Sequence, residues 1–172
     1  PIEEDNWVCA AEFADSAGAD IINTSLGYST FDDPALNHTY AEMDGNTTRI
    51  SRAADMASAR GIVVVVSAGN QGATPWHYIS APSDADSVLA VAAMNAEGAI
   101  APFSSRGPSS DGRVKPDITA VGQGTWMADP AAGIRQGNGT SLSAPVITGL
   151  AACLRQARPE ASSATLVQSV RE

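Results

Sequence analysis

The stretch GIVVVVSAGN, at residues 61–70, decides the fold class of this chain of 172 residues. Its isoleucine and four consecutive valines put apolar side chains on both faces of an extended strand. Such a strand is typical of the centre of a parallel sheet that is covered on both faces. The stretch therefore predicts a layered α/β fold.

The segments on both sides of this strand alternate between helical and strand-like patterns. The predicted helices are residues 7–17, 49–60 and 142–157, with another at 166–170, and the predicted strands are 20–27, 62–67, 87–94 and, more briefly, 117–121. The polar stretches 28–48 and 103–124 are predicted to be loops. We expect one three-layer unit, with a mainly parallel sheet and helices on both faces.

Charge and composition exclude several classes of partner. The formal net charge is −9 at pH 7, so the long-range field repels nucleic acids and anionic membranes. The longest apolar run, residues 61–68, is too short to span a bilayer. Cys9 and Cys153 lie in apolar helical patterns without metal-ligand spacing, so we expect two buried thiols, although a disulfide between them stays open.

Three segments end in small polar residues: SLG at 25–27, SAGN at 67–70 and GTS at 139–141. In an open parallel sheet, ligands bind beyond the carboxyl ends of the strands, where the first two segments fall. At a helix N-terminus, Ser141 could act as a nucleophile with its own free N–H beside it, and Asn70 could offer a second donor. Taken singly, Ser141 would instead be a helix cap and Asn70 a turn residue.

The order of these segments, together with FSSRGP at 103–108 and KPDI at 115–118, resembles the subtilisin-like serine proteases. The resemblance covers most of the chain, from the first predicted helix to beyond Pro159. It implies a serine endopeptidase in which Ser141 attacks the scissile carbonyl, while Asn70 and the Ser141 N–H hold the oxyanion. The residues that would bind the polypeptide substrate are Ser25, Leu26, Gly27, Ala68, Gly69 and Thr140.

In this family an aspartate and a histidine precede the serine, with the histidine in a His-Gly-Thr context. Here His38 and His77 both follow the SLG segment, in polar loops without that context. We therefore expect residues 1–172 to be a partial, subtilisin-like domain that lacks the aspartate and histidine motifs and is inactive alone. We also expect its uncovered sheet surface to favour self-association. A non-catalytic, peptide-binding pseudoprotease domain is the alternative.

The resemblance implies no cofactor, although structural calcium is common in the family. The acidic loop residues that could bind calcium are Asp32, Asp33, Asp44, Asp84, Asp86 and Asp111. They form no tight Asp-x-Asp-x-Asp-Gly loop, so we expect a solvated surface and assign no metal site. From the family alone we expect a secreted or cell-envelope protein, and a cis peptide at Ala81-Pro82.

Overall fold

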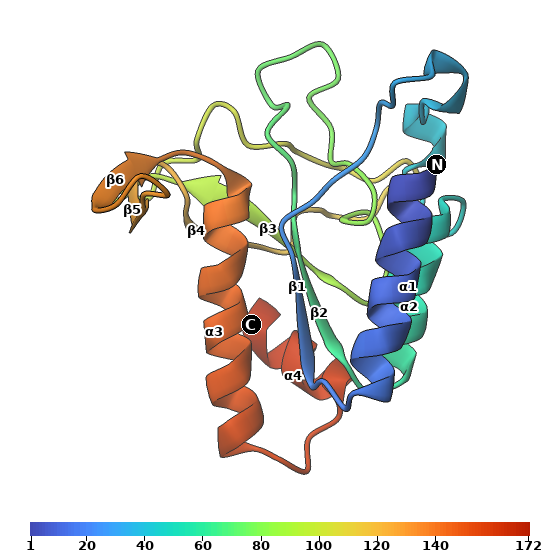
Figure 1. Ribbon diagram of the computed structural model, residues 1–172, viewed down its shortest axis with the longest axis vertical. Coiled ribbons are helices and arrows are strands. Elements are labelled where there is room, and N and C mark those ends of the chain that lie inside the picture. The colour runs from blue at the N-terminus through green and yellow to red at the C-terminus, as the bar shows by residue number, and fades with distance from the viewer.

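Figure 1 shows the computed structural model, which describes all residues 1–172 as a sheet between two layers of helices. The sheet contains β1 (Ile21–Thr24), β2 (Val63–Ser67), β3 (Leu89–Met94) and β4 (Ile118–Val121), in that order and all parallel. The helices are α1 (Ile2–Ser16), α2 (Arg49–Ala59), α3 (Thr140–Ala157) and α4 (Ser163–Arg171). The predicted three-layer α/β fold is confirmed.

The valines of β2 divide the core into two halves. Val64 and Val66 pack in the cluster that contains α1 and α2, while Val63 and Val65 pack in the cluster of α3 and α4. This division follows from the alternation of side chains along a strand. All four valines are fully buried, and each burial contributes roughly 1.5–3 kcal/mol relative to an exposed side chain. Figure 1 shows α3 on one side of β1 and β2, with α1 and α2 on the other.

Two of the helices, α2 and α4, begin at a side-chain cap. The Thr48 hydroxyl accepts from the Ser51 N–H at the start of α2, and the Ser162 hydroxyl accepts from the Thr165 N–H at the start of α4. The first helix begins at Ile2, five residues before the predicted start. Its first turn is acidic, and the positive end of the helix dipole stabilises acidic residues there. The start was missed because these residues are polar and add nothing to the apolar periodicity. None of the helices has the length and apolar composition needed to cross a membrane.

The predicted apolar helix faces are only partly buried. Phe13 is 73% exposed, and Val146 and Leu150 on α3 are 54% and 45% exposed. The buried residues of α3 are mostly small: Thr140, Ser143, Ala144, Ile147 and Ala151. The prediction of two buried thiols is wrong, because Cys9 on α1 and Cys153 on α3 are both exposed and free. Small residues allow α3 to approach the sheet closely, and this leaves its larger side chains outside.

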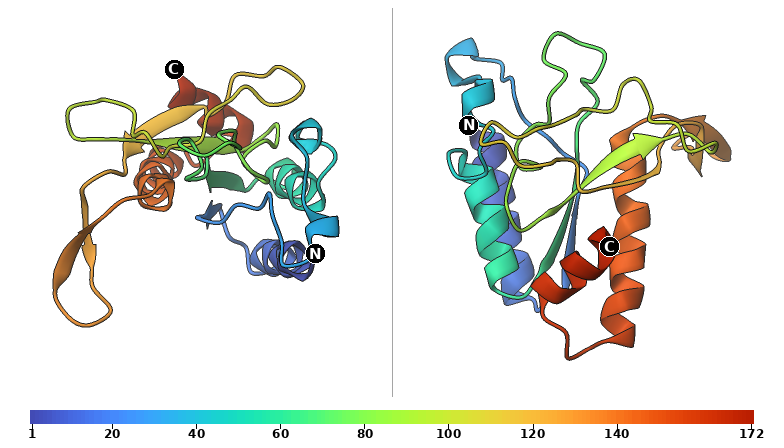
Figure 2. Two further views of the ribbon diagram at one scale, coloured as in Figure 1. Left: turned by 90° about the horizontal axis from the view of Figure 1, so that it is seen from above. Right: turned by 180° about the vertical axis from the view of Figure 1, so that it is seen from behind.

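An antiparallel hairpin that the sequence analysis did not predict precedes α3. It consists of β5 (Thr125–Ala128) and β6 (Ile134–Gly137), and it projects from the body of the protein (Figure 2, left). Its strands expose Trp126 and Ile134.

The predicted loop at 28–48 contains two short 3₁₀ turns, η1 (Pro34–Leu36) and η2 (Tyr40–Glu42).

Candidate active site

The candidate site lies where the strands of the parallel sheet end and α3 begins. Gly122, directly after β4, anchors the start of α3 because its carbonyl accepts from the Gly139 N–H at 2.8 Å. A Cβ at position 122 would clash with the Ser143 hydroxyl and would lie 2.7 Å from the Gly139 carbonyl oxygen. Glycine at position 122 therefore allows the first turn of α3 to sit directly on the carboxyl edge of the sheet.

Ser141 lies in the first turn of α3, after the N-cap residue Gly139. It is therefore not the cap residue, and this alternative from the sequence is excluded. The Ser141 hydroxyl donates to the Ser25 carbonyl oxygen at 3.3 Å, and the Ser25 hydroxyl donates to the Ser141 carbonyl oxygen at 3.1 Å. These reciprocal bonds join the end of β1 to the start of α3 across 116 residues of sequence.

The structure brings Asn70 onto the residue that directly precedes Ser141. Asn70 Oδ1 accepts from the Thr140 N–H at 2.9 Å and from the Thr140 hydroxyl at 3.1 Å. Because a backbone N–H can only donate, the amide atom that faces it must be the oxygen. Asn70 Nδ2 is therefore left with two N–H donors, and the residue is exposed.

Thr140 holds the two neighbouring segments together. It is fully buried, and its hydroxyl accepts from the Gly69 N–H at 3.2 Å while it donates to Asn70. Ala68 is also fully buried, with its N–H bound to the Val91 carbonyl. Of the residues predicted to bind substrate, these two thus pack behind the surface.

The segment 25–27 continues β1 as an exposed edge. Leu26 is 50% exposed, and pairing resumes only at Tyr28, which exchanges both backbone hydrogen bonds with Ala81. A hollow of about 230 Å³ lies beside this edge, between α1 and β1, and is lined by Trp7, Ala10, Ala11, Ala14 and residues 22–26. β1 is an outer strand of the sheet, so its other edge carries no strand.

Ser80 is buried directly behind this surface, although the sequence analysis did not select it. A Cβ at Gly27 would clash with the Ser80 hydroxyl, and a Cβ at Gly69 would lie 3.1 Å from it. The hydroxyl thus lies close to both glycines. The signal that could have identified Ser80 was its place directly before Ala81-Pro82, whose peptide is cis as predicted.

The two histidines lie away from the serine. His38 Nε2 is 3.0 Å from Glu4 Oε1, and this hydrogen bond raises the pKa of His38 above its ordinary value. His77 is exposed, and its Nδ1 lies 3.1 Å from the Pro75 carbonyl oxygen. Neither ring contacts Ser141, whose hydroxyl is directed to Ser25.

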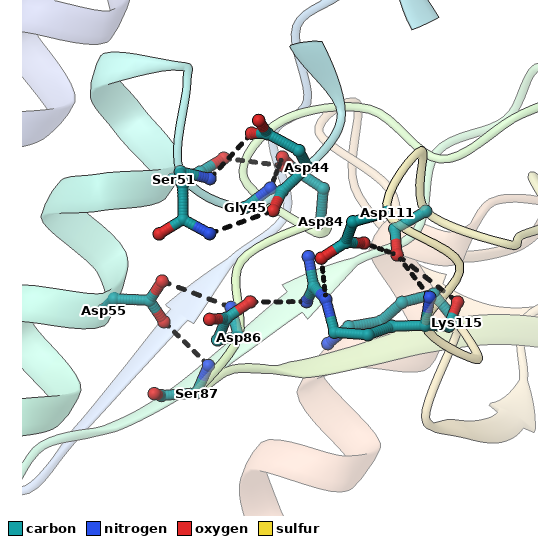
Figure 3. Close-up of polar contacts among 12 residues, drawn as sticks. Asp44, Gly45, Ser51, Asp55, Asp84, Asp86, Ser87, Asp111 and Lys115 are labelled. Atoms are coloured by element: carbon teal, nitrogen blue, oxygen red, sulfur yellow. Dashed lines mark hydrogen bonds and ion pairs between the residues drawn. The ribbon is translucent and has the colours of Figure 1, made fainter. Parts of the chain in front are cut away.

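Four of the acidic residues considered for calcium form other contacts: Asp44, Asp84, Asp86 and Asp111 (Figure 3). Asp86 and Asp111 bind the Arg113 guanidinium at 2.8 and 2.7 Å, and the bond from Arg113 lowers the pKa of Asp111. Asp84 is fully buried and accepts from the Ser51 hydroxyl and the Gly45 N–H, and burial raises its pKa. Asp33 and Asp44 accept backbone N–H groups in local turns, while Asp32 is exposed. No group of three or more histidine, cysteine or acidic side chains has the geometry of a metal site.

Comparison with known proteins shows which family this chain resembles. The sequence model of the Subtilase family matches residues 4–171. Subtilisin DY of Bacillus licheniformis is 32% identical over 157 residues, which cover 91% of this chain and 50% of that protein. Serine protease AprX of Bacillus subtilis (strain 168) is 31% identical, over 82% of this chain and 34% of that protein. The chain thus spans half or less of the length of these curated relatives.

Solved structures agree with the fold. The self-cleaved protease domain of PatA has a TM-score of 0.74 at 27% identity and covers 96% of this chain and 57% of its own. A cold adapted subtilisin-like serine proteinase has a TM-score of 0.72 over 94% of this chain and 51% of its own. At 20% identity, the second likeness concerns the fold alone.

Proposed function

Because the chain belongs to the subtilase family, we propose that it forms the nucleophile-bearing part of a serine endopeptidase. The Ser141 Oγ attacks a peptide carbonyl carbon and loses its proton to a base; the amine then leaves with a proton, and water hydrolyses the acyl-enzyme. The observation that carries this proposal is the hydrogen bond of 2.9 Å from the Thr140 N–H to Asn70 Oδ1. It keeps a side-chain donor beside the helix turn of the candidate nucleophile.

Two donors would stabilise the oxyanion. The Ser141 N–H lies in the first turn of α3, where N–H groups lack an intrahelical acceptor and the helix dipole is positive. Asn70 Nδ2 is the second donor, because Oδ1 of the same amide is occupied by Thr140. Donors that are fixed before the reaction need no reorganisation as charge develops, and they usually make the largest contribution to this type of catalysis.

An extended substrate would lie along residues 25–27. Leu26 and Gly27 precede the first pairing with Ala81, so a peptide can add to this segment through main-chain hydrogen bonds. The side chain before the scissile bond would enter a pocket with Gly69 on its wall and Ala68 behind it. The Ser80 hydroxyl would lie inside this pocket, where it favours small or polar side chains.

The general base would come from a polypeptide segment outside these 172 residues, as the family resemblance leads us to expect. β1 has a free edge, and α3 exposes Val146 and Leu150. A further parallel strand beside β1 would end at the same edge as Ser25, which already contacts Ser141. A residue that follows such a strand could therefore reach the Ser141 hydroxyl.

Covalent labelling with a fluorophosphonate tests the proposal. The full-length protein that contains this sequence should label at Ser141, and Ser141→Ala should remove the label. Ser143→Ala, two positions away and buried, is the matched control and should keep it. The 172-residue chain alone should not label, because an alcohol without a base is a weak nucleophile. Failure of the full-length protein to label would contradict the proposal, and labelling of the chain alone would contradict a base from another segment.

A second candidate function is peptide binding without cleavage. It is favoured by the direction of the Ser141 hydroxyl, which donates to the Ser25 carbonyl and not to a base. A full-length protein that binds an extended peptide along residues 25–27 but neither labels nor cleaves would support this alternative.

The proposal also covers partners and location. Polypeptides are the proposed substrates, with no part for nucleic acids, membranes or a cofactor.

A melting temperature that falls with a chelator would reveal structural calcium. A chain that associates through the free edge of β1 should sediment faster as its concentration rises. A secreted or cell-envelope location rests on the family alone, and fractionation of the source cells would test it.

A further inference from the structure

We propose that Ser105 is a positioning residue that fixes the backbone conformation of Asn70, and this inference rests on the proposed role of Asn70 as an oxyanion donor. Ser105 belongs to the loop between β3 and β4 and lies 35 positions after Asn70 in the sequence. It is 1% exposed. It forms no hydrogen bond to Ser141 or to the Asn70 side chain, so it would act through the main chain.

Ser105 holds both peptide units that flank the Cα atom of Asn70. Its N–H donates to the Gly69 carbonyl oxygen at 2.9 Å, which fixes the peptide unit before Asn70. Its hydroxyl accepts from the Gln71 N–H at 3.1 Å, which fixes the peptide unit after Asn70. The orientations of these two planes set the φ and ψ angles of the residue between them. One serine thus determines the direction in which the Asn70 side chain leaves the backbone.

The loop around Ser105 is itself anchored. The Ala101 N–H donates to the Ala93 carbonyl of β3 at 2.9 Å, and the Gly72 N–H donates to the Phe103 carbonyl at 2.8 Å, so main-chain bonds hold this loop. A Cβ at Gly69 would lie 2.9 Å from the Ser105 hydroxyl, so the two segments are in close contact. The segment that carries Ser105 is therefore connected to the central sheet and does not move as an independent loop.

The expected effect of Ser105→Ala follows from this geometry. The variant keeps the bond to Gly69 but loses the acceptor for the Gln71 N–H, so the second peptide unit can rotate. A displacement of about 1 Å in a positioned group can cost about 100-fold in rate, and one of the two bonds remains. We expect kcat to fall about 10-fold with little change in KM, because the donor acts mainly on the transition state.

A double-mutant cycle in the full-length protein tests the inference, with kcat and KM measured on a peptide substrate for wild type, Ser105→Ala, Asn70→Ala and the double variant. Rates are normalised to fluorophosphonate-labelled sites, so that unfolded molecules are not counted. If Ser105 acts through Asn70, Ser105→Ala should lower kcat about 10-fold in the wild type and less than about 2-fold in Asn70→Ala. A purely structural role would give the same factor in both backgrounds and would overturn the inference.

Ser104→Ala is the matched control, because this neighbouring serine is equally buried but bonds to Ala93. It should lower the melting temperature by a similar amount and leave kcat unchanged. Should Ser105→Ala not fold, Ser105→Cys, which keeps a weak acceptor of similar shape, takes its place and should lower kcat only when Asn70 is present. An equal fall of kcat in Ser104→Ala would overturn the inference. A wild type that does not cleave peptides would instead overturn the proposed function, and with it any role for Ser105 in catalysis.

Discussion

The two edges of the sheet differ in how their polar groups are used. At the carboxyl edge, the groups around Ser141 are uncharged, and Asn70 Nδ2 keeps its donors free. At the amino ends of β3 and β4 the groups are charged and bind one another: Asp117 contacts both Lys115 and Arg171 at 2.8 Å. The comparison teaches that a polar network can either leave donors for a ligand or use them to hold the fold. Variants at the two edges should therefore separate activity from stability.

The largest expected effect is on stability, from Asp117→Asn at the amino edge. Lys115 is 2% exposed in its side chain, and burial lowers its pKa, so it depends on the Asp117 carboxylate for compensation. Removing one partner of a buried ion pair typically costs about 3–5 kcal/mol. We expect the free energy of unfolding, from urea titration, to fall by about 3 kcal/mol or more.

The control for this prediction removes the charge that would be left alone. Lys115→Met combined with Asp117→Asn should be more stable than Asp117→Asn by itself, because no unpaired cation remains buried. The rate per labelled site should be unchanged in both variants. A fall in that rate would show that the two edges are coupled, and it would contradict the separation of activity from stability.

Asn70→Ala, at the carboxyl edge, should have the next largest effect. We expect kcat of the full-length protein to fall by about 10²–10³, a magnitude taken from the loss of the oxyanion asparagine in subtilisin itself. Asn70→Asp keeps the acceptor for the Thr140 N–H but loses the Nδ2 donor, so it should lose as much kcat and retain the melting temperature. Full activity in Asn70→Asp would contradict the role of Nδ2.

A smaller effect should appear as a pH dependence of stability through His38. The hydrogen bond to Glu4 raises the pKa of His38 in the folded protein, and Glu42 lies 3.9 Å from its other nitrogen. A raised folded pKa means that the stabilisation is complete below the unfolded value near 6.5 and is lost as pH rises through the folded pKa. Urea unfolding above pH 6.5 should show a decrease in stability that His38→Gln reduces. An equal decrease in His38→Gln would assign it to other groups.

The smallest expected effect tests an uncompensated hydroxyl in the first turn of α3. The Ser143 hydroxyl is buried without a hydrogen-bond partner and lies against Gly122. Ser143→Ala should leave the free energy of unfolding unchanged or raise it by up to about 1 kcal/mol, because an unsatisfied hydroxyl is removed. A clear loss of stability, measured by urea titration, would contradict the absence of a hydrogen-bond partner for the Ser143 hydroxyl.

The parts of the fold that could be predicted are those that a local pattern fixes. The β2 valines specify a buried strand by composition alone, and parallel strands end at one edge whatever their loops do. Gly122 after β4 binds the start of α3 at the same edge, and the structure thereby brings Asn70 to the residue before Ser141. The sequence marks Ser80 only by its place before Ala81-Pro82, and the contacts that Ser80 and Ser105 make with Gly69 could not be predicted, because loop segments with no periodicity create them.

Burial was predicted less well than secondary structure. Apolar spacing identified α3, but it could not show that Val146 and Leu150 are exposed in this chain. The β5–β6 hairpin escaped prediction because its strands have only four residues each and Ile134 is followed by polar Arg135 and Gln136. The exposure of Val146 and Leu150 depends on what lies beside α3, which no window of sequence contains.

The misjudged thiol on α3 offers an accessibility probe. Cys153 is exposed on the helix that also exposes Val146 and Leu150, one turn or two away. Maleimide should alkylate it rapidly in the 172-residue chain, and any polypeptide that shields that side of α3 would slow the reaction. Cys9, on the opposite layer, provides an internal reference in the same sample. The ratio of the two alkylation rates would thus measure how strongly this side of α3 is shielded, with no need for catalytic turnover.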